Sequence, residues 1–257
     1  MVYFYYSLFF VSGLLWGSFL NAWIWRTREN LSIFSGRSMC THCRQKIFWY
    51  DNIPVVSFFI LKGKCRYCQQ PISWHYPIVE FTVAVLFLFF GILDANNQHI
   101  FTPETLRDWT IIFYLVFIFT YDLKYKEILY RMTLPLSAVL FMVSIAMNWH
   151  TAISMLLGVA IGAGFFLFQY VISSGKWIGG GDILLGTLMG VILGYPNIIL
   201  ALMLSYILGA IIGLLLILLK KKEMKSEVPF GTFLVVGTLI TMCWGNQIVG
   251  WYIGLLR

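Results

Sequence analysis

Residues 198–219 read IILALMLSYILGAIIGLLLILL and contain no charged side chain. A helix needs about 20 predominantly apolar residues to cross the hydrocarbon core of a bilayer. The whole chain shares this composition, because 60% of its 257 residues are hydrophobic and only 11% are charged. In ordinary soluble domains about 45–50% of the residues are hydrophobic and about 25% are charged. The sequence therefore predicts a polytopic membrane protein and excludes a soluble globule or a disulfide-rich secreted domain.

Similar apolar segments predict an all-α fold with about eight transmembrane helices. Their ranges are 3–25, 77–93, 109–122, 132–148, 151–173, 182–195, 198–219 and 229–251. We expect the first to be an uncleaved span, because it is too long for a signal-peptide core and no positive charge precedes it. Three parts follow: a first helix over 1–25, a polar loop domain over 26–76 and a seven-helix domain over 77–257.

Small residues four apart predict close helix packing inside the membrane. The pairs are Gly13/Gly17, Gly158/Gly162, Gly186/Gly190, Gly190/Gly194 and Gly209/Gly213.

The distribution of positive charge predicts the orientation. Alternating the sides of the membrane from loop 26–76 puts every Lys and Arg except Arg107 and Arg257 on the side of that loop. Basic residues mark cytoplasmic loops, so we expect this side to be cytoplasmic and both termini to lie outside. The net charge of +7 could also suit a nucleic-acid partner, but the chain has no motif of that kind and we expect none.

The loop contains two cysteine pairs, Cys40-Thr-His-Cys43 and Cys65-Arg-Tyr-Cys68. Two such pairs allow four thiolates to surround one tetrahedral Zn²⁺, which closes the coordination shell and makes the site structural. A disulfide is disfavoured because the cytoplasm is reducing. One pair alone could be a redox site, but two in one short loop favour zinc.

Two acids stand apart from those in the loops. Asp122 follows an apolar run, and Asp182 follows Gly179-Gly180-Gly181 and opens a predicted span. The predicted topology places both at the cytoplasmic ends of their helices, where ionisable groups are functional candidates. The alternatives are that Asp182 only caps its helix and that Asp122 is compensated by Lys124 or Lys126.

The two carboxyl groups would have a clear chemistry if they met. Like charges at close range share one proton. The ionised carboxylate can then take a proton from water while the protonated one polarises a peptide carbonyl. The glycines before Asp182 would let a substrate backbone approach closely and could donate N–H groups to the developing oxyanion. Glu80 is a third acid near the inner surface, and its simplest role is an ion pair with a loop arginine.

The ordered set of motifs resembles the bacterial type IV prepilin peptidases, or leader peptidase/N-methyltransferases, which are GxGD-type membrane aspartyl proteases. The matching stretches are Gly17-Ser18-Phe19-Leu20-Asn21, Arg37-Ser38-Met39-Cys40, Asp51-Asn52-Ile53-Pro54, Gly63-Lys64-Cys65-Arg66-Tyr67-Cys68, Tyr76-Pro77-Ile78-Val79-Glu80, Asp122 with Glu127-Ile128, Gly180-Gly181-Asp182, and Pro229-Phe230-Gly231. The chain departs from the family pattern in having Leu129 and Thr232 for Pro, and Ile183-Leu184 for Val-Lys.

The resemblance implies a specific activity in the bacterial inner membrane. Asp122 and Asp182 would cleave the basic leader of a type IV prepilin or type II secretion pseudopilin after a Gly at the cytoplasmic surface. It also implies methylation of the new N-terminal residue with S-adenosylmethionine, attached to the zinc loop. The sequence does not identify the residues that bind this cofactor, nor the oligomeric state.

Two other classes of function compete with a peptidase. One is a zinc-stapled, proton-coupled transporter, since carriers also use intramembrane Asp residues. The absence of an inverted repeat and the placement of both acids at one face weigh against it. The other is a catalytically silent assembly scaffold.

Overall fold

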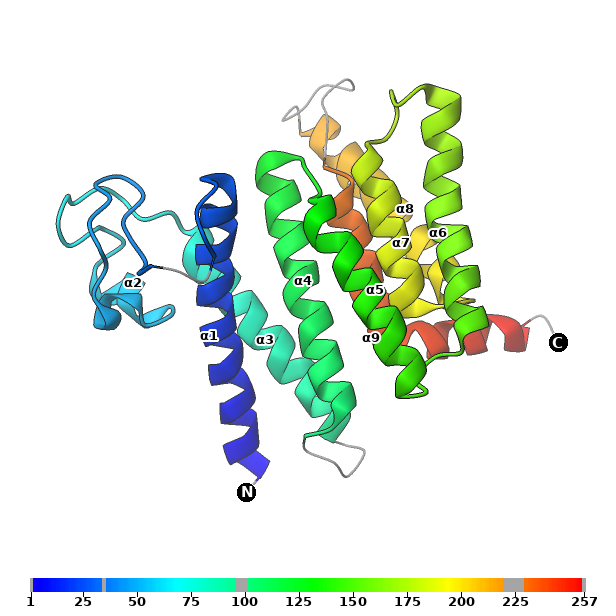
Figure 1. Ribbon diagram of the computed structural model, residues 1–257, viewed down its shortest axis with the longest axis horizontal. Helices are drawn as coiled ribbons and strands as arrows, with labels where there is room; N and C mark the ends of the chain where they lie inside the picture. Colours follow the sequence, from blue (N-terminus) through cyan, green and yellow to red (C-terminus); the bar gives the residue numbers. More distant parts are fainter. Residues whose placement is uncertain (1, 34–35, 96–100, 220–228, 256–257) are drawn as a thin grey trace. The chain divides into compact units, whose positions relative to one another are not determined.

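The computed structural model describes residues 2–33, 36–95, 101–219 and 229–255, and apart from two isolated β-bridges its regular secondary structure is helical (Figure 1). The predicted all-α class is therefore confirmed. The helices are α1 (Val2–Arg28), the 3₁₀ turn η1 (Trp49–Asn52), α2 (Val56–Ile60), α3 (His75–Ala95), α4 (Pro103–Tyr125), α5 (Tyr130–Ala146), α6 (Ala152–Ser173), α7 (Gly180–Leu193), α8 (Asn197–Leu218) and α9 (Gly231–Leu255).

Every predicted span coincides with one of these helices, but they are not equally suited to cross a bilayer. Among the described residues, five helices are both long and apolar enough, namely α1, α3, α6, α8 and α9. Helices α5 and α7 are apolar but shorter, and α4 carries charged residues at both ends. Helix α7 has 14 residues and is about 21 Å long at 1.5 Å per residue, which is less than the ~30 Å hydrocarbon core.

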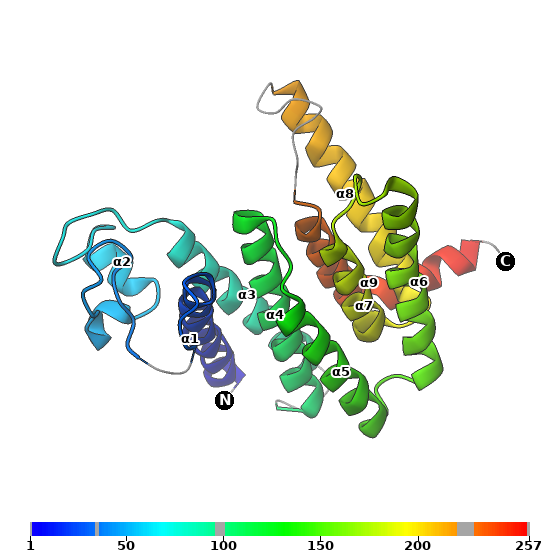
Figure 2. The same cartoon turned by 45° about the horizontal axis from the view of Figure 1, so that its top comes forward.

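The chain divides into two compact units, one ending at Phe117 and the other beginning at Ile118. In the N-terminal unit, α1 packs along α3 (Figures 1 and 2). A Cβ added to Gly13 would lie 2.5 Å from Cα of Ala84, and one added to Gly17 would lie 2.7 Å from Cα of Glu80. The predicted role of this glycine pair in close packing is therefore confirmed.

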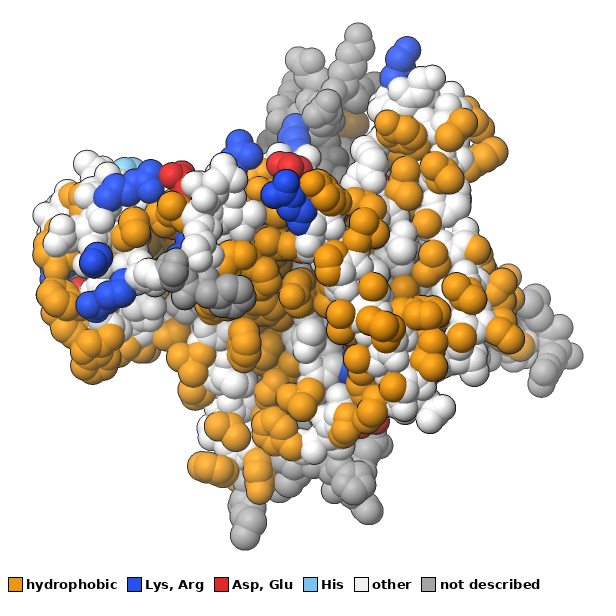
Figure 3. All heavy atoms as spheres, viewed as in Figure 1, with side chains coloured by type: hydrophobic (Ala, Val, Ile, Leu, Met, Phe, Trp, Pro, Cys, Tyr) orange, Lys and Arg blue, Asp and Glu red, His pale blue; other side chains and the backbone are white. Residues whose placement is uncertain are grey.

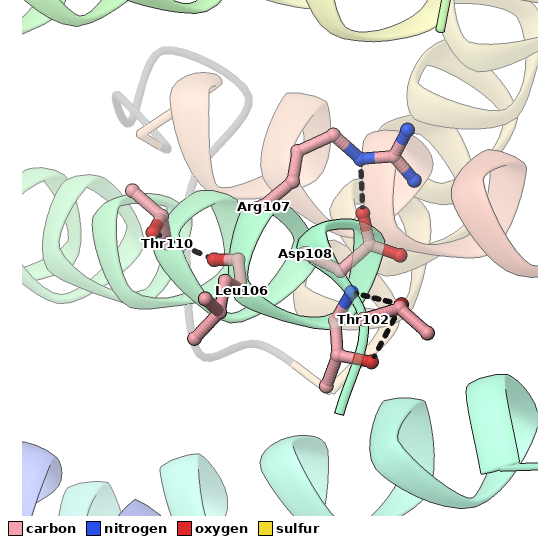
Figure 4. A network of polar contacts seen from close by, with 6 residues as sticks. Thr102, Leu106, Arg107, Asp108 and Thr110 are labelled. Carbon is pink, nitrogen blue, oxygen red and sulfur yellow. Dashed lines mark hydrogen bonds and ion pairs between the residues drawn. The ribbon is translucent and has the colours of Figure 1, made fainter. Parts of the chain in front are cut away.

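The start of α4 belongs to the same unit and lies at the opposite end of the helix from Asp122. Thr102 caps the helix by accepting a hydrogen bond from the N–H of Thr105 at 3.2 Å. Arg107 forms an ion pair with Asp108 at 2.7 Å, as Figure 4 shows. At the next residue, the indole N–H of Trp109 donates to the carbonyl of Phe87 in α3. These contacts fix the beginning of α4 by local capping and by packing on α3.

In the C-terminal unit, α7 is the central helix, in contact with α5, α6, α8 and α9. Figure 1 shows it between α5 and α6. Backbones of α6 and α7 touch, because a Cβ on Gly158 would lie 2.5 Å from the carbonyl oxygen of Gly190. The prediction for Gly209/Gly213 is wrong in part, since nothing among the described residues lies within 4 Å of a Cβ at Gly213.

Some of the predicted charge pattern cannot be located. Lys220, Lys221, Lys222, Lys225 and Arg257, which the orientation prediction used, lie outside the described residues.

Candidate active site and metal centre

Asp122 lies in the last turn of α4 and is buried, with 5% of its surface exposed. Its Oδ2 accepts a hydrogen bond of 3.1 Å from the backbone N–H of Thr232, the second residue of α9. A carboxylate at the C-terminus of its own helix opposes that helix dipole, but the N-terminus of another helix attracts it. The N-terminus of α9 therefore compensates the negative charge of Asp122. Lys124, one of the predicted partners, lies instead over the ring of Tyr125.

Gly231 and Thr232 are site residues that sequence reasoning did not assign. A Cβ on Gly231 would lie 2.7 Å from Oδ2 of Asp122, so any other residue here would displace the carboxyl group. Thr232 stands where the family pattern has Pro, and Pro has no backbone N–H. This departure therefore provides Asp122 with a hydrogen-bond donor that the family residue would lack.

Asp182 is the third residue of α7, where Gly179 is the N-cap. The expected role of Asp182 in capping its helix is confirmed, although the N-cap position itself belongs to Gly179. Its Oδ2 accepts the N–H of Gly179 at 3.2 Å, and its own N–H donates to the carbonyl of Gly179 at 3.1 Å. Asp182 therefore satisfies the start of its helix and is itself buried, with 7% of its surface exposed.

Ile128 connects the surroundings of the two acids. A Cβ on Gly181 would lie 2.8 Å from Cβ of Ile128, and one on Gly231 would lie 3.1 Å from its Cδ1. Gly181 directly precedes Asp182, and Gly231 lies against the carboxyl group of Asp122, so Ile128 packs beside both acids. Sixty residues apart in sequence, the two acids are brought to one place in the C-terminal unit.

The glycines before Asp182 differ in their surroundings. Nothing among the described residues lies within 4 Å of a Cβ placed on Gly180, whereas Gly181 is filled by Ile128 and Gly179 meets only ordinary contacts. A side chain would therefore meet open space at Gly180, whereas the small size of Gly181 is explained by packing.

The four loop cysteines form a cluster in the N-terminal unit. The sulfur atoms of Cys40, Cys43, Cys65 and Cys68 all lie within 4.8 Å of one another, and Cys40 and Cys68 are 3.8 Å apart. A Zn–S bond of about 2.3 Å gives a tetrahedron whose edge is about 3.8 Å. The donor set therefore fits one metal ion such as Zn²⁺, while His42 is exposed.

Both cysteine pairs adopt the same local fold. In the first, the N–H of Cys40 donates to Gln45 and Arg44 has φ +59°; in the second, Cys65 donates to Gln70 and Gln69 has φ +57°. Burial raises the pKa of the Cys65 thiol, but the N–H groups of its own turn and the neighbouring thiols lower it to about 7. Although the N–H of Gln70 lowers it, burial and the other thiols raise the pKa of Cys68 to about 11. The fit to a metal ion therefore rests on the positions of the four sulfur atoms.

Glu80 does not pair with a loop arginine, which corrects that expectation. Its Oε2 accepts the backbone N–H of Val55 at 2.7 Å, and the side chains of Ser18 and Asn21 also interact with it. Among the loop arginines that the structure describes, Arg66 binds Asp51 through two hydrogen bonds of 2.6 and 2.8 Å and Arg44 binds Glu29. Glu80 therefore links α3 to the segment before α2.

Two families of known proteins match successive parts of the chain. A bacterial peptidase A24 N-terminal domain matches residues 11–93, and the type IV leader peptidase family matches residues 109–214. No solved structure matches the chain.

Three relatives match over most of their length, and all are named prepilin leader peptidase/N-methyltransferase. The protein from Legionella pneumophila is 32% identical, covering 89% of this chain and 79% of the relative. Those from Bacillus subtilis and Aeromonas hydrophila are each 30% identical, covering 96% and 97% of this chain and 97% and 94% of the relatives. With both halves matched in order, the chain belongs to the type IV leader peptidase family.

Proposed function

We propose that the protein is a membrane aspartyl endopeptidase that removes the basic leader of type IV prepilins or type II secretion pseudopilins and methylates the new N-terminus. The observation that carries the proposal is the packing of Ile128 against both Gly181, next to Asp182, and Gly231, which touches Asp122, so the two acids lie in one part of the C-terminal unit. The names of the relatives support the peptidase and the methyltransferase activity. The transporter and scaffold alternatives have no comparable support.

The dyad would act by sharing one proton. The ionised carboxylate takes a proton from water, whose oxygen attacks the peptide carbonyl, and the protonated carboxyl donates to the carbonyl oxygen. Collapse of the intermediate breaks the C–N bond, and the leaving nitrogen takes a proton from the dyad. The open space at Gly180 supports a close approach of the substrate backbone, with Gly179 and Gly181 beside it.

The arrangement in the membrane is part of the proposal. Eight spans would place residues 1–25 and 77–257 in the inner membrane, with segment 26–76 in the cytoplasm and both termini outside. The short α7 supports a site within reach of the inner surface, because a helix of about 21 Å cannot reach both faces. Cleavage after a Gly at that surface would leave the apolar part of the substrate in the bilayer.

The metal and the methyl donor belong to segment 26–76. Cys40, Cys43, Cys65 and Cys68 would hold Zn²⁺ as a structural ion, because four thiolates leave no open position. When bound, S-adenosylmethionine would supply an activated methyl group to the amine that cleavage creates. The chain's own contribution there is to hold the two cysteine turns together.

The experiment that tests the dyad is leader cleavage by purified full-length protein in lipid vesicles. Asp122→Asn and Asp182→Asn should each reduce kcat/KM by about 10²-fold or more, because each removes the acid–base function of one carboxyl. Glu104→Gln, at the other end of α4, is the matched control and should leave cleavage unchanged. Activity above a tenth of the wild-type value in either Asn variant would remove the dyad from the mechanism.

A further inference from the structure

Helix α2 and Trp74 present an apolar surface that the described residues of the N-terminal unit leave exposed. Val56, Phe59, Ile60 and Trp74 are 50%, 59%, 66% and 61% exposed, whereas Phe58 on the other side of the helix is buried. The rings of Phe59 and Trp74 are 6.2 Å apart. Figure 3 shows hydrophobic side chains covering the lower margin of this part of the molecule. We call these four residues the apolar face; contiguous exposed patches of this kind mark interaction sites.

The depth of α2 along the spans is fixed by a hydrogen bond. The N–H of Val55, directly before α2, donates to Glu80, which lies five residues after the start of α3. At 1.5 Å per residue this is about 7.5 Å along the helix. Figure 1 likewise shows α2 below the upper end of α1. Both α1 and α3 are candidate spans, so α2 begins beside the spans rather than above their ends.

The backbone at this bond has an unusual conformation. Val55 has φ +61° and ψ −51°, and the N–H of Val56 donates to the carbonyl of Pro54 at 2.6 Å. This is a γ-turn of the rare positive-φ kind, which is strained, most of all for a β-branched residue. Strained backbone persists only where surrounding contacts determine it. The buried carboxylate of Glu80 supplies such a contact and holds α2 at this depth.

The charge of the surrounding segment indicates which partner covers the face. Between residues 36 and 74 there is one acid, Asp51, which is bound to Arg66. The same segment has six basic residues, among them Lys62 and Lys64, which follow α2 and are exposed. Anionic lipid headgroups attract such a segment, whereas the basic leader of a prepilin is repelled by it.

We propose that the apolar face is embedded in the phospholipid leaflet next to it, with Lys62 and Lys64 at the headgroups. Interfacial segments of this kind bury their apolar side about 5–10 Å into the boundary between headgroups and acyl chains. Trp is enriched at that level, which suits Trp74. The segment that carries the four-cysteine cluster would then be anchored in the membrane surface at a fixed depth.

Photo-crosslinking in the full-length protein tests this proposal. The photoreactive residue p-benzoylphenylalanine is placed at Ile60 and, as a matched control, at Gln70, which is exposed in the same segment but lies outside α2 and the apolar face. Each protein is reconstituted in nanodiscs of phosphatidylethanolamine and phosphatidylglycerol, irradiated and analysed by mass spectrometry. We expect phospholipid adducts at Ile60 and none above background at Gln70.

Two outcomes would overturn the proposal. One is equal or absent lipid adduct at both positions. The other is loss of the Ile60 adduct when prepilin is added, with crosslinks to prepilin in its place, which would assign the face to the substrate.

A second variant, Phe59→Glu with Ile60→Glu, should speed trypsin cleavage after Lys62 and Lys64 without loss of bound zinc, and unchanged cleavage would count against embedding. Both readouts are independent of the peptidase dyad.

Discussion

Replacing Gly231 by Ala is the sharpest test of how α9 positions Asp122. The added Cβ would lie 2.7 Å from Oδ2, and ordinary contact begins at 3.4 Å, so the oxygen must retreat by about 0.7 Å. Movement along the bond would lengthen the 3.1 Å contact with the N–H of Thr232 to about 3.8 Å, beyond the 2.7–3.2 Å range of such bonds. The variant therefore removes a hydrogen bond to the carboxylate.

The expected loss follows from that bond. Hydrogen bonds to charged groups contribute about 1.5–3 kcal/mol, and each 1.36 kcal/mol is a factor of ten in rate. Gly231→Ala should therefore lower kcat/KM for leader cleavage by about 10- to 150-fold. Folding should not suffer equally, because the clash is with the end of a flexible side chain.

The assay compares leader cleavage with thermal unfolding of the same preparations. Gly164→Ala is the control, because it makes the same substitution in α6 with nothing among the described residues within 4 Å of the new Cβ. It should retain wild-type activity. The argument would be refuted if Gly231→Ala kept half of the wild-type kcat/KM, or if its loss of activity were matched by a loss of Tm.

The remaining predictions concern the N-terminal unit and the two activities. Cys65→Ser, or removal of metal by a chelator, should expose segment 36–74 to proteolysis before the helices unfold, because the four thiolates hold two separate turns together; metal analysis that finds no zinc in reduced protein would contradict this. Glu80→Ala should free the N–H of Val55 and increase its hydrogen exchange. Glu80→Gln keeps an acceptor oxygen and should protect that N–H, so equal exchange in the two variants would contradict the prediction. Asp182→Asn should still methylate a pre-cleaved pilin when given S-adenosylmethionine, since methyl transfer needs positioning rather than an acid–base pair. Mass spectrometry of the pilin N-terminus measures this, and loss of methylation in the variant would mean that the two sites share residues.

The four-cysteine cluster could be predicted from the spacing of the cysteines in the sequence. Two Cys-x-x-Cys turns each bring their own sulfurs together, and only the pairing of the two turns depends on the fold. The positive φ of Arg44 and Gln69 at matching places shows that the turns form in the same way. The position of α2 could not be predicted, because it depends on a bond between Val55 and Glu80, 25 residues later.

The sequence by itself determined the all-helical membrane class, the places of the helices, the two cysteine turns and the two candidate acids, because hydrophobicity and short-range spacing carry that information. Only the tertiary structure decided what surrounds the acids. Asp122 receives its hydrogen bond from Thr232, 110 residues away, and Ile128 fills the space between Gly181 and Gly231. Such contacts arise when the end of one helix packs against the start of another, and no local pattern in the sequence encodes which ends will meet.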